Sequence, residues 1–286
     1  MTRTRHHRPA VLSALLAALL TGAGAARVDA AEGRILATGG ITQIEGAGGG
    51  GLVPWATIVG YSAQGQWDAD ASLSVVRTGD FHLSAAAVGV GAGDRLELSL
   101  ARQRLSLDGA MRGDDTDLDI LGAKFRLGGD LIYDRWPQLS VGLQYKRQHP
   151  AAAVKAIGVT ERDDVDLYLA ATRLFLDGPG HRNWLVNVAL RSTRAHQLGL
   201  LGFSGQRRLV PEVSTVVLLN PRWAIGAEYR AKPDSLAGLR EDDWLDVFVG
   251  WFPNKRFSAA LGYVDLGEVA GLTDQRGWFL NLKWNP

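Results

Sequence analysis

Strand-like segments in this chain are joined by connections that alternate between long and short. The long polar connections lie at 195–208, 232–243 and 267–276, and the short ones at 177–181, 220–222 and 252–255. Between them apolar and polar residues alternate with a period of two, as from Trp223 to Arg230, which is the primary signal of a β-strand. Strands that cross a bacterial outer membrane have tight periplasmic turns and longer outer loops. The pattern predicts an all-β fold, an antiparallel up-and-down transmembrane β-barrel.

The alternation predicts fourteen strands of about the length that a tilted strand needs to cross a bilayer. They are 34–44, 52–62, 66–77, 81–90, 94–106, 117–127, 138–148, 163–176, 182–194, 209–219, 222–231, 243–252, 256–264 and 277–284. If the chain ends in the periplasm, the connection at 62–66 is periplasmic too, so the strand at 52–62 needs a predecessor at 34–44. The glycine run Gly46–Gly51 would then be their outer loop. The alternative is twelve strands with the Gly-rich N-terminal region inside the lumen as a plug.

The N-terminus has the features of a secretory signal peptide. Arg3, Arg5 and Arg8 precede an apolar core at 10–20, and Val28-Asp-Ala30 suits cleavage. We therefore expect a signal peptide at 1–30 and one outer-membrane barrel domain at 31–286. Removal of residues 1–30 takes away four Arg and one Asp and leaves 27 basic and 29 acidic residues. This balance gives no positive field for nucleic acid.

Other features of the composition narrow the class of protein that the chain can belong to. The chain has no Cys, so lipid attachment at a cysteine and disulfides are excluded. After residue 30 no apolar run reaches eighteen residues, so membrane-spanning helices are not expected. Aromatic residues gather at the predicted strand ends, which predicts two interfacial belts, although cross-strand packing in any large sheet could also place them there. Those near short turns or the C-terminus are Tyr61, Trp67, Phe175, Trp184, Trp223, Phe252, Phe257 and Trp284, and those near long loops are Tyr145, Tyr229, Trp244, Tyr263 and Trp278.

The last strand carries a pattern typical of the assembly signal that the outer-membrane insertion machinery reads. Gln275 is followed by Gly277 and then by hydrophobic residues at alternating positions, among them Leu280 and Leu282. Such signals end on an aromatic residue, whereas this chain continues past Trp284 to Asn285-Pro286.

Strand parity assigns charged residues to the lumen, because an Arg or Lys facing lipid at the membrane centre costs about 2–4 kcal/mol. The candidate lumen and selectivity residues are Asp68, Asp70, Glu97, Lys124, Arg126, Lys146, Asp164, Asp166, Arg191, Glu228 and Arg230, and the same parity places Gln144, Asn187 and Lys283 inside. Arg102 and Arg104 instead share the parity of Leu98, so we expect either a bulge or a position at headgroup level.

Acidic clusters open the strands that follow three long loops, and bases end the strands before those loops. The acidic cluster that includes Asp117 and Asp119, for example, would lie across a hairpin from Arg102 and Arg104. These charges could form rim salt bridges that shape loops, a field that selects charged solutes, or sites where divalent cations join the acids to lipopolysaccharide.

No catalytic or metal-binding constellation is evident, so we expect neither an enzyme nor a cofactor. His82, His149, His181 and His196 are isolated in sequence. His82 and Ser84 are two residues apart and offer only a weak hint of a hydrolase.

Several stretches together resemble a family of secreted proteobacterial proteins known only as a domain of unknown function. They include Leu52-Val-Pro-Trp55, Phe252-Pro-Asn-Lys255, Tyr263-Val-Asp-Leu-Gly267 and Asp274-Gln-Arg-Gly-Trp278. The resemblance implies a Gram-negative envelope protein and carries no ligand or activity with it.

From the residues we expect passage of small solutes through the barrel, either as a passive channel or as a ligand-gated uptake path. A structural or adhesion barrel with a closed lumen is the alternative, and an outer-membrane hydrolase a more distant one. Membrane lipid, lipopolysaccharide and the insertion machinery are the expected partners.

Overall fold

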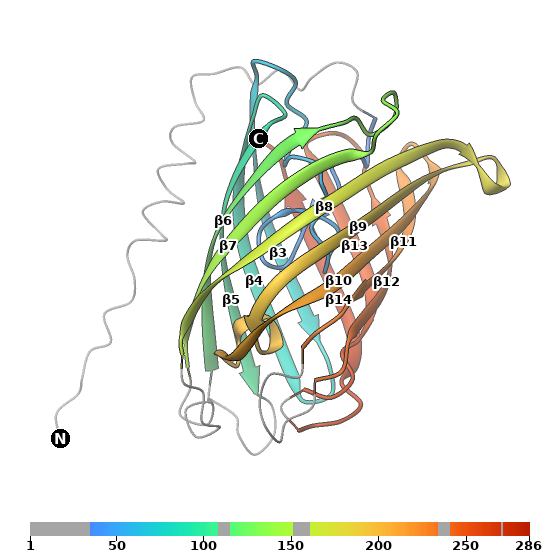
Figure 1. The fold of residues 1–286 in the computed structure, drawn as a ribbon. Coiled ribbons are helices and arrows are strands. Elements are labelled where there is room, and N and C mark those ends of the chain that lie inside the picture. The colour runs from blue at the N-terminus through green and yellow to red at the C-terminus, as the bar shows by residue number, and fades with distance from the viewer. Residues whose placement is uncertain (1–34, 108–114, 151–160, 234–240, 270) are drawn as a thin grey trace, which may run out of the picture.

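The structure is a computed structural model that describes residues 35–107, 115–150, 161–233, 241–269 and 271–286, so the predicted signal peptide lies outside the described residues. Twelve antiparallel strands form a closed barrel (Figure 1). The strands are β3 (Trp67–Arg77), β4 (Phe81–Ala92), β5 (Leu96–Leu107), β6 (Asp115–Gly128), β7 (Gln138–His149), β8 (Asp163–Gly178), β9 (Arg182–Ala195), β10 (Phe203–Asn220), β11 (Trp223–Arg230), β12 (Trp244–Trp251), β13 (Phe257–Asp265) and β14 (Arg276–Trp284).

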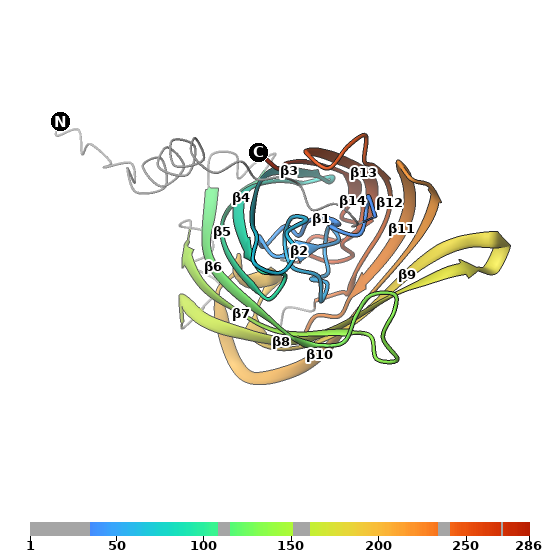
Figure 2. The same cartoon turned by 90° about the horizontal axis from the view of Figure 1, so that it is seen from above.

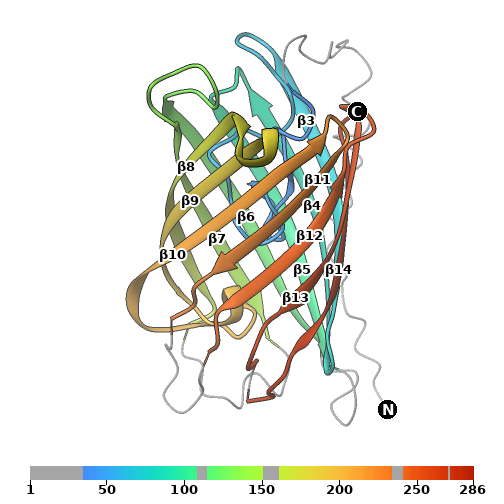
Figure 3. The same cartoon turned by 90° about the vertical axis from the view of Figure 1, so that its right-hand side faces the viewer.

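Each strand pairs with its neighbours in sequence, and β14 pairs with β3 to close the ring. Closure leaves no free sheet edge, which is what a sheet needs in lipid, where no water is present to satisfy backbone groups. The strands tilt strongly against the barrel axis, as Figure 3 shows for β8 to β12. The predicted up-and-down barrel is confirmed.

The count of fourteen strands is wrong, and the alternative prediction of twelve strands with the N-terminal region as a plug is confirmed. Residues 35–62 lie inside the ring of strands (Figure 2), and we call this segment the plug. Its two short strands, β1 (Ile41–Thr42) and β2 (Gly48–Gly49), pair only with each other in a separate sheet. The predicted strands 34–44 and 52–62 are therefore not part of the wall. Their apolar residues alternate like those of a strand, but they pack inside the lumen.

The outer face of the barrel is a band of exposed apolar side chains. Its members include Leu73, Leu98, Leu121, Leu143, Leu169, Val188, Val213, Ile225, Val247, Leu261 and Leu282. They alternate along each strand with residues that face the lumen, as lipid-facing and lumen-facing positions do in a membrane barrel. Within the described ranges, no helix is both long enough and apolar enough to cross a membrane.

One end of the barrel holds the C-terminus and the tight turns β8–β9, β10–β11 and β12–β13, and we call it the short-turn end (Figure 1). The opposite end is the long-loop end. The alternation of connection lengths has two exceptions, because residues 78–80 form a short turn at the long-loop end and residues 129–137 a longer connection at the short-turn end.

The predicted aromatic belts are present in part. Trp67, Phe175, Trp223 and Trp284 are exposed near the short-turn end, and Tyr263 and Trp278 are exposed near the long-loop end. Three other aromatic residues are buried instead, namely Tyr61 in the plug, Phe252 and Trp244. Trp244 faces inward because its register partner on β11 is Arg230, a lumen residue.

Candidate functional site: a charged lumen and its plug

Lys124 on β6 binds the plug backbone at three points. Its Nζ donates to the carbonyl oxygens of Gly48, Trp55 and Thr57 at 2.9, 3.1 and 2.7 Å, and lies 2.9 Å from Glu97 Oε2. Lys124 is completely buried, so its charge must be compensated by protein groups such as these. A plug with little regular structure leaves most of its backbone polar groups without partners from secondary structure, and each one needs a partner once it is buried.

Acidic wall residues satisfy the plug's amides in the same way. Glu97 on β5 accepts from Gly48 N at 3.0 Å and from Val59 N at 2.8 Å. Glu228 on β11 accepts from Leu52 N at 2.7 Å. Four neutral wall side chains form hydrogen bonds with Trp55 or Ala56 of the plug, namely Gln138, Ser140, Thr172 and Ser214.

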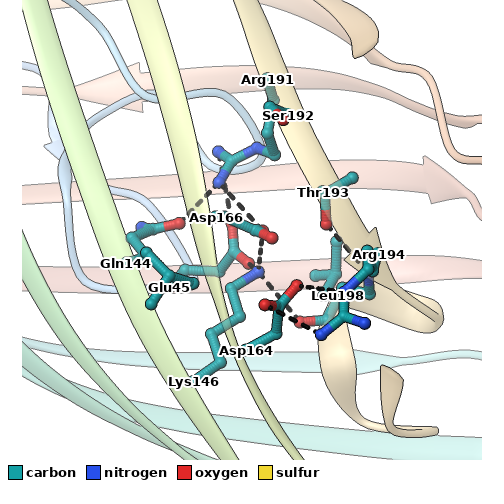
Figure 4. Close-up of polar contacts among 12 residues, drawn as sticks. Glu45, Gln144, Lys146, Asp164, Asp166, Arg191, Ser192, Thr193, Arg194 and Leu198 are labelled. Atoms are coloured by element: carbon teal, nitrogen blue, oxygen red, sulfur yellow. Dashed lines mark hydrogen bonds and ion pairs between the residues drawn. The ribbon is translucent and has the colours of Figure 1, made fainter. Parts of the chain in front are cut away.

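The centre of the lumen holds a cluster of three bases and three acids, which we call the Glu45 cluster. Its members are Glu45 of the plug and the wall residues Lys146, Asp166, Arg191, Glu212 and Arg230. All six side chains are at most 3% exposed. Figure 4 shows how Lys146 of β7 and Arg191 of β9 converge on Glu45 and on Asp166 of the intervening strand β8.

Glu45 is bound through both of its carboxylate oxygens. Oε1 accepts a hydrogen bond from Lys146, whereas Oε2 lies 2.5 Å from Arg230 Nη1 and 3.6 Å from Arg191 Nη2. Gln43 Nε2, also in the plug, donates to Oε2 at 2.8 Å. Burial raises the pKa of Glu45, but the positive charges of Arg230, Lys146 and Arg191 outweigh burial, so the pKa lies well below its ordinary value. Glu45 is therefore an anion inside the barrel.

The wall holds its own counter-charges to these bases. Arg191 Nε donates to Glu212 Oε1 at 2.5 Å, and Lys146 Nζ donates to Asp166 Oδ2 at 2.6 Å. The guanidinium of Arg191 also lies 5.2 Å above the ring of Tyr168. The bases of the cluster are thus bound to acids of the wall as well as to the plug.

The long-loop end of the lumen is closed by apolar packing. Residues 196–202, which include the short helix η3 (Gln197–Gly199), are buried inside the barrel, and we call them the inward loop. Around it lie Val76, Phe81, Leu83, Leu105, Trp244, Leu266 and Val269. The space left among them is about 20 Å³, room for about one water molecule.

Nine of the eleven predicted lumen residues are buried in the barrel interior. They are Asp68, Asp70, Glu97, Lys124, Lys146, Asp166, Arg191, Glu228 and Arg230, and the related prediction for Gln144, Asn187 and Lys283 has the same outcome. Their predicted role in selectivity stays a prediction. Each of these twelve side chains contacts the plug or another member of the set. Strand parity predicts that they face inward but does not predict these contacts.

The other two predicted lumen residues lie at the ends of the barrel. Arg126 is at the short-turn end, where it binds Asp94 and lines a cavity of about 560 Å³. Asp164 is at the long-loop end, held by Arg194 at 3.1 Å and Arg207 at 2.8 Å. Both have the inward parity, but their strands have already left the central lumen at these positions.

Sequence reasoning missed three acids. Glu45 falls between the predicted strands 34–44 and 52–62, and the prediction assigns neither Glu212 nor Asp246 to a face. The parity of β10 and β12 identifies the latter two, because Glu212 pairs in register with Arg230 and Asp246 with Glu228. The glycine run offers a signal for the plug, since a Cβ at Gly50 would lie 1.8 Å from Glu228 Oε1.

The arginines at the outer rim pair with acids as predicted. Arg102 lies 2.8 Å from Asp117 Oδ2, and Arg104 Nε lies 2.7 Å from Asp117 Oδ1. The register between β5 and β6 is unbroken over these residues, so there is no bulge and the arginines keep the outward parity near the long-loop end. Partly exposed pairs of this kind contribute about 0–1 kcal/mol each.

The residues of the predicted assembly signal have structural roles in the strand that closes the barrel. Gln275 Nε2 donates to Asp80 Oδ2 at 2.7 Å and its Oε1 accepts from Asp80 N at 3.1 Å, which holds the β3–β4 turn. Leu282 is on the lipid face, Leu280 is half-buried, and Gly277 packs against the backbone of Arg77. Recognition by the insertion machinery stays a prediction.

Three of the four histidines each lie beside one carboxylate, namely His149 beside Asp119, His181 beside Asp177 and His196 beside Glu241. His82 and Ser84 lie on the outward parity of β4, opposite Arg77 and Val75 of β3. Among the described residues, no group of three or more His, Asp or Glu side chains is arranged to hold a metal ion.

A closed antiparallel barrel with an apolar exterior and a charged interior defines an outer-membrane β-barrel of a Gram-negative bacterium. The chain belongs to the family described as "Protein of unknown function (DUF3034)", whose profile matches residues 38–283. This confirms the resemblance drawn from the sequence.

Solved structures of other outer-membrane proteins match the chain at low identity. Omp33 of Acinetobacter baumannii is 10% identical, with 77% of this chain and 98% of that chain covered and a TM-score of 0.47. The KdgM porin is 7% identical, with 75% and 98% covered and a TM-score of 0.46, and the NanC porin 8% identical, with 75% and 97% covered and a TM-score of 0.47. No curated protein matches the chain significantly.

Proposed function

We propose that this chain is an outer-membrane uptake barrel for small solutes, in which movement of the plug opens the path through the lumen. The observation that carries the proposal is the way the plug is held. Its backbone and Glu45 are bound by side chains of the wall, and β1 and β2 form a sheet separate from the barrel. The barrel's own strand pairing is complete without the plug.

A polar contact of this kind can be exchanged for water. Water that bridges polar groups is nearly as favourable in enthalpy as a direct hydrogen bond, so wall groups such as Glu97 and Lys124 can be hydrated when the plug leaves. Charged pairs buried permanently are, by contrast, often no more stabilising than apolar residues of similar volume. The charged residues of the lumen therefore favour a function in which the path is filled with water during part of the transport cycle.

The closed structural barrel is the second candidate, and the apolar packing around the inward loop favours it. For uptake, this layer must also move, because the space among its side chains has room for only about one water molecule. The two functions differ in whether the plug moves relative to the wall. That movement can be blocked covalently.

A disulfide between the plug and β4 provides the test. A Cβ built on Gly46 lies 3.7 Å from Ala87 Cβ, within the range that disulfides need. The chain has no cysteine, so Gly46→Cys/Ala87→Cys introduces one defined pair. Gly46 has φ of 95°, so an L-residue there costs about 1–2 kcal/mol, which Gly46→Cys/Ala87→Ser controls for.

Ion current through the refolded protein in planar bilayers is the readout. We expect stepwise current from the reduced double variant, none after oxidation, and recovery with dithiothreitol, while the control conducts throughout. Equal current in both redox states would show that plug movement does not open the path. Silence in both states, from a barrel with normal heat-modifiable mobility, would support the closed structural barrel instead.

A further inference from the structure

We propose that the Glu45 cluster is a binding site for the carboxylate of an anionic solute, and that Glu45 occupies this site in the resting barrel. A solute carboxylate that takes the place of Glu45 would release the plug. This inference rests on the proposed function and adds to it the chemical class of the solute.

The charge balance of the cluster is the first argument. Lys146, Arg191 and Arg230 face two wall acids, Asp166 and Glu212. When Glu45 leaves, three bases remain against two acids. The site then has one uncompensated positive charge, on wall groups that are at most 3% exposed while the plug is in place. A monoanion restores neutrality, whereas the same site offers no reason to bind a cation or a neutral solute.

The geometry of the site is the second argument. Two ligating groups bind different oxygens of Glu45, Lys146 at Oε1 and Arg230 at Oε2, and Arg191 approaches Oε2 from a third strand. This is a two-point site for a planar carboxylate. Wall contacts hold the bases in place, because Arg191 also binds Glu212 and Gln144, at 2.5 and 2.6 Å. The site is therefore built before the carboxylate arrives.

The position of Glu45 in the plug is the third argument. Gly46 N donates to Gln43 O at 2.7 Å, so Glu45 lies at the tip of a tight turn between β1 and β2. Gln43 Nε2 supports the carboxylate from within that turn. The plug thus presents one carboxylate on a compact turn, as a tethered solute would. A solute that replaces the Glu45 carboxylate removes the ion pairs that the plug makes in this cluster.

The test uses the reactivity of a single cysteine in the plug. Ala47 is 2% exposed, so the thiol of Ala47→Cys reacts with N-ethylmaleimide only when the plug moves. Propionate is the probe, since it has the same atoms as the Glu side chain beyond Cα. Propionamide and chloride, at matched concentration and ionic strength, are the controls for shape and charge.

The expected sign of the propionate effect depends on Glu45. In the Ala47→Cys protein, propionate competes with Glu45 and speeds labelling. In Glu45→Ala/Ala47→Cys the plug is already loosened, with labelling faster by about tenfold or more, because a buried base has lost its partner. There propionate fills the vacant space and slows labelling. Propionamide has neither effect.

A loosened plug with an intact site is the matched control. Thr42→Val/Ala47→Cys removes the hydrogen bond from Thr42 Oγ1 to Asp70 at 2.9 Å and leaves Glu45 in place. Propionate should still speed labelling in this protein. If propionate acts no differently from chloride in all three proteins, the cluster is a structural ion network and the inference is wrong.

The outcome is separable from that of the proposed function. Current controlled by the Gly46–Ala87 disulfide, without any propionate effect, would keep the uptake path and remove the carboxylate site. Slowing by propionate in Glu45→Ala/Ala47→Cys, with no current in either redox state, would keep the site and remove the uptake path.

Discussion

Lys146 joins two separate segments inside the lumen, because the Nζ that binds Glu45 of the plug also lies 3.0 Å from the carbonyl oxygen of Leu198 in the inward loop. The same ammonium group contacts Asp166 of the wall at 2.6 Å. One buried side chain thus connects the plug, the wall and the segment that closes the long-loop end. Movement of the plug is expected to affect the inward loop through this residue.

Replacing Lys146 with methionine should destabilise the closed barrel. Lys146→Met leaves the carboxylates of Glu45 and Asp166 with one base fewer, and removing one member of a buried ion pair costs about 3–5 kcal/mol. Arg147→Met is the matched control, since Arg147 is the next residue and is exposed on the opposite face, where the change is within about 1 kcal/mol. The free energy of unfolding in urea, followed by tryptophan fluorescence in detergent, is the measurement. Equal losses in both variants would contradict the central position of Lys146.

The wall makes room for the plug with small residues on the inward face of β4. A Cβ at Gly91 would lie 2.4 Å from the carbonyl oxygen of Val59 in the plug. Gly91→Ala is therefore expected to displace the plug and to raise the ion current above that of the native chain, while the barrel keeps its heat-modifiable mobility. Gly128→Ala is the control, because a Cβ there has nothing within 4 Å. A silent Gly91→Ala barrel would show that the plug adjusts locally and stays in the lumen.

The sequence predicts the wall well because the period of two is a direct consequence of strand geometry. The predicted strand at 138–148 is Gln138–His149 in the structure, and that at 277–284 is Arg276–Trp284. The inward position of buried charges such as Lys124 and Asp166 also follows from parity. These predictions need only the pattern within one strand.

The plug could not be predicted with the same certainty, because its apolar residues alternate too. Ile41 and Leu52 are buried as strand residues would be, but they share an apolar core with wall residues remote in sequence, and β1 lies against β13 and β14. The choice between fourteen and twelve strands depends on whether the wall can close without residues 34–62, which is a property of the whole ring. The partners of Glu45 lie 101 and 185 residues away in sequence, at Lys146 and Arg230, and no local pattern indicates such pairs.

Alkaline pH should stabilise the long-loop end through Lys232, which follows β11. Burial lowers the pKa of Lys232 to about 8 from 10.5, and Glu241 and Asp243 oppose the shift. Below pH 8 the folded chain bears the full cost of the buried ammonium group. Between pH 8 and 10.5 the folded chain has lost the proton and the unfolded chain retains it, so stability rises with pH, by about 3 kcal/mol over the window.

The measurement is the free energy of unfolding at several pH values from 7 to 10, compared with Lys232→Met. All other groups titrate in both proteins, so the difference between the two isolates Lys232. The gap between the variant and the native chain should narrow as the pH rises. A gap that is constant with pH would mean that the ammonium of Lys232, which lies 4.9 Å from the ring of Trp244 and 2.8 Å from Gln197 Oε1, is stabilised as well as it is in water.

Closure of the barrel should fail when Gly277 is replaced, whether or not cellular machinery is present. A Cβ at Gly277 would lie 1.8 Å from the carbonyl oxygen of Arg77, where β14 meets β3. Gly277→Ala is therefore expected to lower the yield of the heat-modifiable form during refolding into detergent, and Leu282→Val, on the lipid face of the same strand, to leave it unchanged. If Gly277→Ala refolds normally in detergent but fails to reach the outer membrane in cells, the glycine acts in recognition by the insertion machinery. Failure in both settings assigns it to the closing pair itself, because a clash with backbone remains wherever the strand folds.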